Sequence, residues 1–190
     1  MTDTSTATGK VVVNRAMSLD GFIAGPGDAM DWMGPDRRLA DFADPSDIRK
    51  IAAATGAMLV GRRTWEVGDK MEKEEPGSVD YPFSGPMFLL SHRPLDPPDP
   101  DVTILTGDIG DAVATALAAA DGKDLEILGA DVASQCLQRG LVDEILVYVL
   151  PFLLGDGVRV TPPDLGRIDL EPISNTRSGD VTLLRFRVIK

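Results

Sequence analysis

The stretch that decides the fold is residues 124–157, which read DLEILGADVASQCLQRGLVDEILVYVLPFLLGDG. Two short apolar runs, residues 125–128 and 145–150, have the length of buried strands. Between them, Asp131 can cap a helix and Gly140 can end it. The order strand, turn, helix, strand predicts a βαβ unit. In such a unit the turn lies at the carboxyl end of the first strand, beside the positive N-terminus of the helix, where phosphate groups tend to bind.

The chain before this unit also alternates between strands and helices. Helices are expected at residues 36–42, after Asp44-Pro45 and after Asp108, because Asp and Pro are typical of helix starts. The charged segment 66–82 is interpreted as a surface loop. Further apolar runs predict buried strands at residues 11–17, 57–60, 87–90 and 102–105.

The last part of the chain has a different pattern. Residues 168–176 and 181–189 are strand-like, and they flank the turn signal Ser178-Gly179-Asp180. This arrangement predicts an antiparallel hairpin that closes an otherwise parallel sheet. The expected fold class is therefore α/β: a three-layer sandwich with a mostly parallel central sheet, helices on both faces and a C-terminal antiparallel hairpin.

Length, composition and charge limit the kind of protein this can be. With 190 residues, 43% of them hydrophobic, we expect a single domain over residues 10–190, after a Thr-rich and Ser-rich tail, residues 1–9, that is disordered. The formal net charge of -11 opposes binding to nucleic acid or to an anionic membrane, so the expected partner is a small-molecule substrate. A single cysteine, a start without a secretory pattern and the lack of a membrane-spanning run indicate a cytoplasmic protein.

The turn Gly129-Ala130-Asp131-Val132 is a candidate pyrophosphate site, because it offers backbone N–H groups at a helix start. If the Asp131 side chain caps the helix, it occupies one of these donors and adds negative charge beside the ligand. The same order of strand, turn and capped helix also occurs where a βαβ unit binds nothing. Scaffold and binding site are therefore both open interpretations of this turn.

Two other strand exits carry positive charge. Gly61-Arg62-Arg63-Thr64 follows the predicted strand 57–60, and Ser91-His92-Arg93 follows the strand 87–90. Arginine suits phosphate because its planar guanidinium donates two parallel hydrogen bonds and stays charged. The alternative is a set of solvated side chains on an acidic protein. Together with the Gly129 turn, these segments are three strand exits that would converge on one edge of a parallel sheet. This convergence favours an anionic ligand.

The segment between the first strand and the first helix holds the catalytic candidates Asp31, Trp32 and Asp36. A hydride-transfer site needs an apolar wall that excludes water and often a proton source, and these three residues supply both kinds of group. His92 is the only histidine, so a histidine-based metal site has little to build on, and no metal ligand is assigned. Cys136 is interpreted as a core thiol on the apolar face of its helix.

Five segments, in this order and spacing, carry a resemblance to a known family: Ala16-Met17-Ser18-Leu19-Asp20-Gly21-Phe22-Ile23-Ala24, Met30-Asp31-Trp32, Gly61-Arg62-Arg63-Thr64-Trp65-Glu66, Leu90-Ser91 and Leu128-Gly129-Ala130-Asp131. With them the chain resembles the dihydrofolate reductase superfamily, and within it the branch similar to the C-terminal reductase domain of the bacterial riboflavin-biosynthesis deaminase-reductase. The similarity to that branch includes residues 140–144, Pro151 and the glycines of 154–157, and it covers nearly all of residues 10–190. The zinc motif of the deaminase is not present in the sequence.

The resemblance implies an NADPH-dependent reductase that commonly forms a homodimer. It further implies that Gly155-Asp156 supports a flexible cover made by residues 20–33. It also implies the cofactor contacts: the backbone of Ala16 and Ile23 would hold the nicotinamide carboxamide, and Ser91, with His92 or Arg93, would lie near the 2′-phosphate. The cofactor phosphates would be met by Gly61, Arg62, Arg63 and Thr64. The pyrophosphate would be surrounded by Gly129, Ala130, Asp131, Val132 and Ala133.

The chain departs from the family pattern in three places, one at the pyrophosphate turn and two that concern the substrate. A single glycine, Gly129, stands where the family usually shows two. The acid of true folate reductases has no clean equivalent, since Asp36 and Arg37 compete for its position, and the hydroxyl residue that partners this acid is replaced around Val147. We therefore expect an NADPH-dependent reductase of an unidentified pterin, ribosylated pyrimidine or other small heterocyclic or carbonyl substrate. A true dihydrofolate reductase and a non-catalytic NADPH-binding protein are the alternatives.

Overall fold

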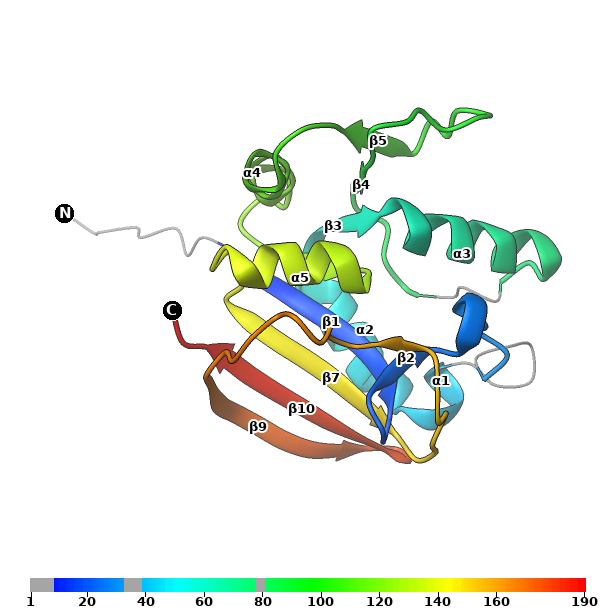
Figure 1. Ribbon diagram of the computed structural model, residues 1–190, viewed down its shortest axis with the longest axis vertical. Coiled ribbons are helices and arrows are strands. Elements are labelled where there is room, and N and C mark those ends of the chain that lie inside the picture. The colour runs from blue at the N-terminus through cyan, green and yellow to red at the C-terminus, as the bar shows by residue number, and fades with distance from the viewer. Residues whose placement is uncertain (1–8, 33–38, 78–80) are drawn as a thin grey trace.

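The computed structural model describes residues 9–32, 39–77 and 81–190 and shows an eight-stranded central sheet (Figure 1). The six strands from β5 to β7 are parallel, β10 runs antiparallel to β7, and β9 runs antiparallel to β10. The predicted α/β class and the C-terminal hairpin are therefore confirmed. Across the sheet the order is β5 (Val102–Leu105), β4 (Met87–Leu90), β3 (Thr55–Gly61), β6 (Asp124–Leu128), β1 (Val11–Ser18), β7 (Glu144–Leu150), β10 (Val181–Val188) and β9 (Leu170–Ser178).

Helices cover both faces of the sheet, as predicted. On one face, α4 (Ile109–Ala119) and α5 (Ala130–Gln138) bury apolar side chains against β1, β3 and β6. On the other, α2 (Pro45–Ala54) packs with the short α1 (Leu39–Phe42) in a second, smaller core. The helix α3 (Arg62–Glu74) lies against β3 and β4. The strands in the middle of the sheet are buried on both sides, which is why they read as continuous apolar runs.

Two of the predicted helix starts are confirmed in detail. The Asp44 carboxylate accepts a hydrogen bond of 2.7 Å from Ser46 N, and Pro45 occupies the first turn of α2. The Asp108 carboxylate accepts one of 2.7 Å from Gly110 N at the start of α4. Both helices begin where the local sequence supplies a partner for backbone N–H groups that have no carbonyl within the helix.

The segment 66–82, predicted as a surface loop, is helical as far as Glu74 in α3. Side chains four positions apart stabilise this charged helix: Arg62 pairs with Glu66 at 2.6 Å and Lys73 with Asp69 at 2.7 Å. The charge that suggested a loop is thus the solvent-facing side of a helix.

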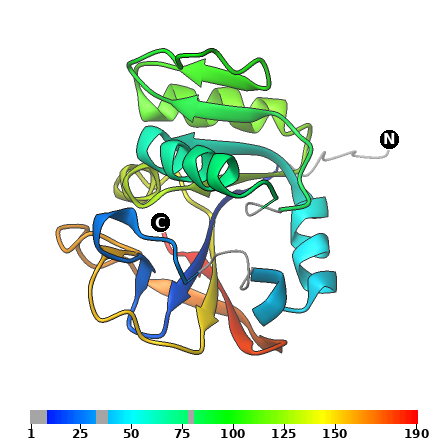
Figure 2. The same ribbon diagram turned by 90° about the vertical axis from the view of Figure 1, so that its right-hand side faces the viewer.

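The segment between β1 and α2 agrees only in part with the sequence prediction. After β1, the chain forms the short strand β2 (Phe22–Ala24) and the 3-10 turn η1 (Pro26–Asp28), neither of which was predicted. Of the predicted helix 36–42, residues 39–42 form α1, whereas residues 36–38 and residues 1–8 of the predicted tail lie outside the described part of the chain. The strand β2 pairs antiparallel with β8 (Val158–Arg159), and this two-stranded sheet stands beside the main one (Figure 2). Among the described residues no helix has the length and apolar character needed to cross a membrane.

Candidate functional site

The exits of β3, β4 and β6 meet at one edge of the sheet, as the sequence predicted. These strands are parallel and paired almost to their ends, with Val60 opposite Leu128 and Gly61 opposite Leu90. The two turns that follow β3 and β6 touch each other. A Cβ added to Gly129 would lie 2.5 Å from Thr64 Oγ1, so this glycine allows a contact that a larger residue would block.

The helices that start at this edge, α3 and α5, have no side-chain cap. Their N-caps are Gly61 and Gly129, whereas α2 and α4 are capped by aspartates. Gly129 has a φ of 92°, a left-handed conformation that favours glycine. The first-turn N–H groups of both helices are therefore available to a ligand, and the helix dipoles add positive potential at the same place.

Asp131 does not cap α5, so the possibility of a capping aspartate, which the sequence left open, is excluded. The N-cap is Gly129 and the helix begins at Ala130, so Asp131 lies inside the first turn. Its carboxylate accepts a hydrogen bond of 2.8 Å from Gln135 Nε2, one turn further along the helix. The backbone donors that a capping aspartate would occupy are left open, and an acidic side chain in the first turn remains beside them.

Arg62, at the exit of β3, forms hydrogen bonds with residues at the exit of β4. Its Nη1 atom donates to the carbonyl oxygens of Arg93 at 3.1 Å and Pro94 at 2.9 Å, and it lies 3.5 Å from Ser91 Oγ. The Ser91 hydroxyl in turn donates to Arg93 O at 2.9 Å, and His92 and Arg93 are exposed. A guanidinium, a hydroxyl and two exposed basic side chains are thus gathered at one strand exit.

The Arg63 side chain instead forms an ion pair with an acidic residue of η1. Its Nε atom donates to the Asp28 carboxylate at 2.6 Å, and its side chain is 71% exposed. The hydrogen bond and the charge of Asp28 raise the pKa of Arg63, so the guanidinium stays positive. This ion pair connects the start of α3 to η1 in the loop after β2.

A groove of about 530 Å³ lies beside the start of α5. Its walls include Phe22 from β2 and Gly157 and Arg159 from the region of β8, opposite Ala130 and Ser134 of α5. The Arg159 guanidinium stacks over the Phe22 ring at 4.7 Å from its centroid. Sequence reasoning did not name Ser134 or Arg159. The position of Ser134, four residues after Ala130 and therefore on the same side of the helix, was the available signal for that residue.

The strand β2, which carries Ile23, is held in place by Asp20. The Asp20 carboxylate accepts hydrogen bonds from the Ser18 hydroxyl at 2.5 Å, Leu154 N at 3.1 Å and Gly155 N at 2.7 Å. The Ser18 hydroxyl and these two backbone N–H groups lower the pKa of Asp20 to about 2. The loop at Gly155 thus supports the segment that begins at Asp20, and Ile23 lies half-buried on β2, as does Ala16 on β1.

Of the three catalytic candidates, the structure describes Asp31 and Trp32. Trp32 is buried, and its ring centroid is 5.6 Å from that of Phe152. Its Nε1 atom has no hydrogen-bond partner among the described residues. Asp31 is exposed, and Asp36 lies outside the described residues. Trp32 therefore belongs to the second apolar core, and Asp31 is not a buried acid.

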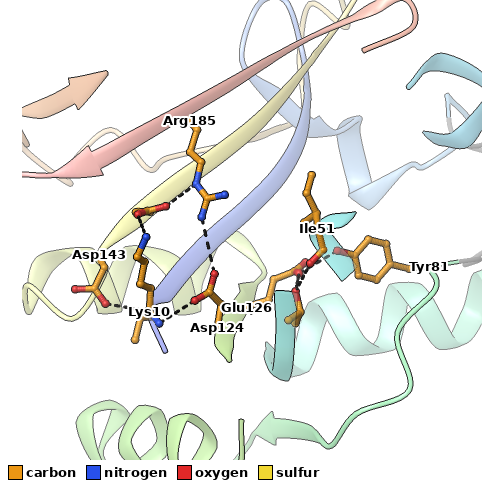
Figure 3. Close-up of polar contacts among 10 residues, drawn as sticks. Lys10, Ile51, Tyr81, Asp124, Glu126, Asp143 and Arg185 are labelled. Atoms are coloured by element: carbon orange, nitrogen blue, oxygen red, sulfur yellow. Dashed lines mark hydrogen bonds and ion pairs between the residues drawn. The ribbon is translucent and has the colours of Figure 1, made fainter. Parts of the chain in front are cut away.

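Sequence reasoning missed a buried acid on β6. The Glu126 carboxyl accepts from Asn14 Nδ2 and is only 4% exposed. It lies 3.1 Å from both Thr55 Oγ1 and Tyr81 Oη (Figure 3). Burial raises the pKa of Glu126, although these hydrogen bonds and Arg15 act in the opposite direction. A glutamate within an apolar run predicted to be a central strand was the signal for this residue.

A second missed group is the hydroxyl of Tyr148 on β7. Tyr148 is 1% exposed and lies next to Ala16 in the parallel pairing of β1 and β7. Its Oη atom has no partner in the described part of the chain, and burial raises its pKa. The strand that lacks the expected hydroxyl at Val147 therefore carries one at the next position.

The fold is that of the dihydrofolate reductases. The structure of the dihydrofolate reductase from Enterococcus faecalis complexed with NADP(H) superposes with a TM-score of 0.59 at 16% identity, covering 96% of this chain and 98% of that one. A Shewanella sp. PV-4 protein with a proposed role in riboflavin biosynthesis has a TM-score of 0.76 at 24% identity, covering 95% and 99% of the two chains.

The family follows from the sequence. The chain belongs to the RibD C-terminal domain family, whose model matches residues 9–184. An uncharacterized protein from Bacillus subtilis, YyaP, is 27% identical over 178 residues, which are 89% of this chain and 88% of that protein. The resemblance inferred from the motifs is confirmed, and the family supports an oxidoreductase function.

Proposed function

We propose that the protein is an NADPH-dependent reductase that transfers hydride to a pterin, a ribosylated pyrimidine or another small heterocyclic or carbonyl substrate. The observation that carries the proposal is the pair of uncapped helix starts, α3 and α5, which touch through Gly129 and Thr64 at the carboxyl edge of the sheet. Two sets of free N–H groups and two positive dipole ends at one place suit a pyrophosphate. Membership of the RibD C-terminal domain family supports the same assignment.

The residues present fit such a cofactor. The N–H groups of residues 62–64 and 130–133 and the Thr64 hydroxyl would bind the pyrophosphate, with Gly61 and Gly129 allowing its close approach. At the exit of β4, Ser91 and Arg62 lie 3.5 Å apart and would bind a 2′-phosphate, with His92 or Arg93 beside them. The backbone of Ala16 and Ile23 would hold the carboxamide of the nicotinamide.

The bound cofactor would supply the hydride, and the protein would position the reactants. Trp32 and Phe152 form an apolar wall that would exclude water from the reacting atoms. The Asp20 carboxylate fixes the loop that carries Ile23, so that the carboxamide contact would be made by a held backbone. The groove between Phe22 and Ser134 continues from the start of α5 and gives the cofactor room beside the proposed pyrophosphate site.

Titration of tryptophan fluorescence with NADPH and with NADH tests the proposal, since Trp32 lies in the core next to β1 and Trp65 lies in the first turn of α3. We expect NADPH to bind more tightly. Arg62→Ala should weaken NADPH more than NADH, by about 1.5 to 3 kcal/mol, if Arg62 donates to the 2′-phosphate. Lys73→Ala, which removes an exposed charge near the other end of α3, is the control.

The same titration distinguishes the roles of the two arginines. Equal losses for both nucleotides in Arg62→Ala or in Arg63→Ala would assign that arginine to the pyrophosphate. If neither nucleotide binds to the wild-type protein, the proposal fails.

A non-catalytic NADPH-binding protein is the second candidate, because Asp31, the residue considered as a proton source, is exposed to solvent. Turnover of a panel of dihydrofolate, other pterins and ribosylated pyrimidines separates the possibilities. Reduction of dihydrofolate alone would identify a true dihydrofolate reductase, and NADPH binding without turnover of any member would favour the non-catalytic protein. The homodimer and the cytoplasmic location are further parts of the proposal, to be tested by sedimentation and by fractionation.

A further inference from the structure

Arg15 on β1 is a buried guanidinium directly behind the Gly129 turn. It is 6% exposed, and every hydrogen bond that it makes within the described residues goes to a backbone carbonyl. Its Nη1 atom donates to Asn14 O at 2.5 Å and to Ile127 O at 2.8 Å, and its Nη2 atom donates to Gly129 O at 2.6 Å. The Nε atom is buried and has no partner in the part of the chain that the structure describes.

No carboxylate among the described residues forms an ion pair with Arg15. The two titratable groups that interact with it through space are Glu126 and Cys136. Burial raises the pKa of Glu126, and it raises the pKa of the Cys136 thiol to about 12. Burial also lowers the pKa of Arg15, but only to about 10, so at neutral pH the guanidinium is positive beside a neutral thiol and an acid that burial drives towards its neutral form. The three backbone carbonyls compensate this buried charge only in part, because none of them carries a full negative charge.

The position of this charge matches the proposed pyrophosphate site. Gly129 O, which accepts from Arg15, also accepts from Ala133 N at 3.1 Å and so belongs to the first turn of α5. The guanidinium therefore adds a full positive charge behind a helix start that already has free N–H groups and a positive dipole end. It also fixes the carbonyl of the residue whose left-handed conformation opens the turn.

We infer that Arg15 is a positioning residue for the cofactor, holding the Gly129 turn open and providing the buried positive charge that the pyrophosphate neutralises. The inference rests on the proposed function, because it concerns the same site. It also explains how a chain with a net charge of -11, and with Asp131 in the first turn of α5, can attract a doubly charged group to that turn.

The test compares ligands that contain the pyrophosphate with one that does not. NADPH and ADP-ribose contain it, whereas adenosine 2′-monophosphate carries only the group assigned to the exit of β4. In Arg15→Met, binding of NADPH and ADP-ribose is expected to fall at least about tenfold, as for the loss of a charged interaction. Binding of adenosine 2′-monophosphate, measured by ligand-observed NMR, should stay as in the wild-type protein.

Two further variants keep the test decisive if Arg15→Met does not fold. Arg15→Gln removes the charge but keeps a hydrogen-bond donor, and it should show the same selective loss. Arg15→Lys keeps the charge and should bind NADPH more tightly than either neutral variant. Arg139→Met, which removes an exposed charge just past the last turn of α5, is the control for net charge and should bind all three ligands as the wild-type protein does.

The outcomes separate this inference from the proposed function. If the wild-type protein binds neither NADPH nor ADP-ribose, the proposed function fails. If the wild-type protein binds them and the neutral variants bind them equally well, the inference about Arg15 is wrong. Equal losses for all three ligands would show a general structural role and would also overturn it.

Discussion

Replacing Glu126 with glutamine should remove a pH-dependent loss of stability. Thr55 Oγ1 lies 3.1 Å from both Ile51 O and Glu126 Oε2, yet a hydroxyl has only one proton to donate (Figure 3). If that proton goes to Ile51 O, the Glu126 carboxyl must donate to Thr55, which requires Glu126 to be protonated. The raised pKa of Glu126, caused mainly by burial, agrees with this arrangement.

Glutamine can make the same contacts as the neutral acid. Its Nε2 atom can donate to the Thr55 and Tyr81 oxygens, while its Oε1 atom accepts from Asn14 Nδ2 as Glu126 does. At pH 5 the free energy of unfolding of Glu126→Gln should therefore lie within about 1 kcal/mol of the wild-type value.

The difference in the free energy of unfolding between Glu126→Gln and the wild-type protein should grow as the pH rises. The folded-state pKa of Glu126 is raised, so above its ordinary value of 4.5 the unfolded chain releases a proton that the folded protein keeps. Wild-type stability then falls with rising pH, at most by about 1.4 kcal/mol per pH unit, until the folded-state pKa is passed. The glutamine variant lacks this proton, so it should become the more stable protein in that range.

Urea unfolding of both proteins from pH 5 to pH 9 measures the difference. Glu144→Gln is the matched control, since Glu144 is equally buried but pairs with Lys10 and Arg185, each at 2.5 Å. Although burial opposes them, these cations lower the pKa of Glu144. The stability that ionised Glu144 contributes is therefore already complete above pH 5. The difference in the free energy of unfolding between Glu144→Gln and the wild-type protein should stay constant from there upward. A constant difference for Glu126→Gln would show that Glu126 is ionised throughout and would refute the reasoning.

Three further outcomes are expected. Gly129→Ala should lower the free energy of unfolding by about 1 to 3 kcal/mol and weaken NADPH, because φ is 92° and the new Cβ would lie 2.5 Å from Thr64 Oγ1; urea unfolding and fluorescence titration measure both effects. Asp20→Asn should speed hydrogen exchange at Leu154 N and Gly155 N, since a neutral oxygen accepts more weakly, and unchanged exchange would contradict the anchoring role. Leu59→Ala, which truncates a fully buried core side chain, should cost about 2 to 5 kcal/mol of stability and leave NADPH affinity of the folded protein unchanged.

Much of the fold could be predicted because its causes are local. The aspartates at positions 44 and 108 act on N–H groups two residues away, so the starts of α2 and α4 can be read from neighbouring residues. The local sequence did not decide the structure at Asp131, because its carboxylate could accept either from the backbone N–H groups of the helix start or from Gln135. A cap was possible, but the helix starts two residues earlier than such a cap would place it, and the carboxylate accepts a hydrogen bond from Gln135.

The sequence by itself determined most of the order of strands and helices, the family, and the three strand exits that form the candidate site, because apolar runs and turn residues act over a few positions. Only the tertiary structure decided which charges are buried and what they contact. Arg15 reaches Gly129, and Asn14 reaches Glu126, across 114 and 112 positions of the chain. Such contacts depend on the pairing of β1 with β6, since that pairing decides which side chains lie together and away from water.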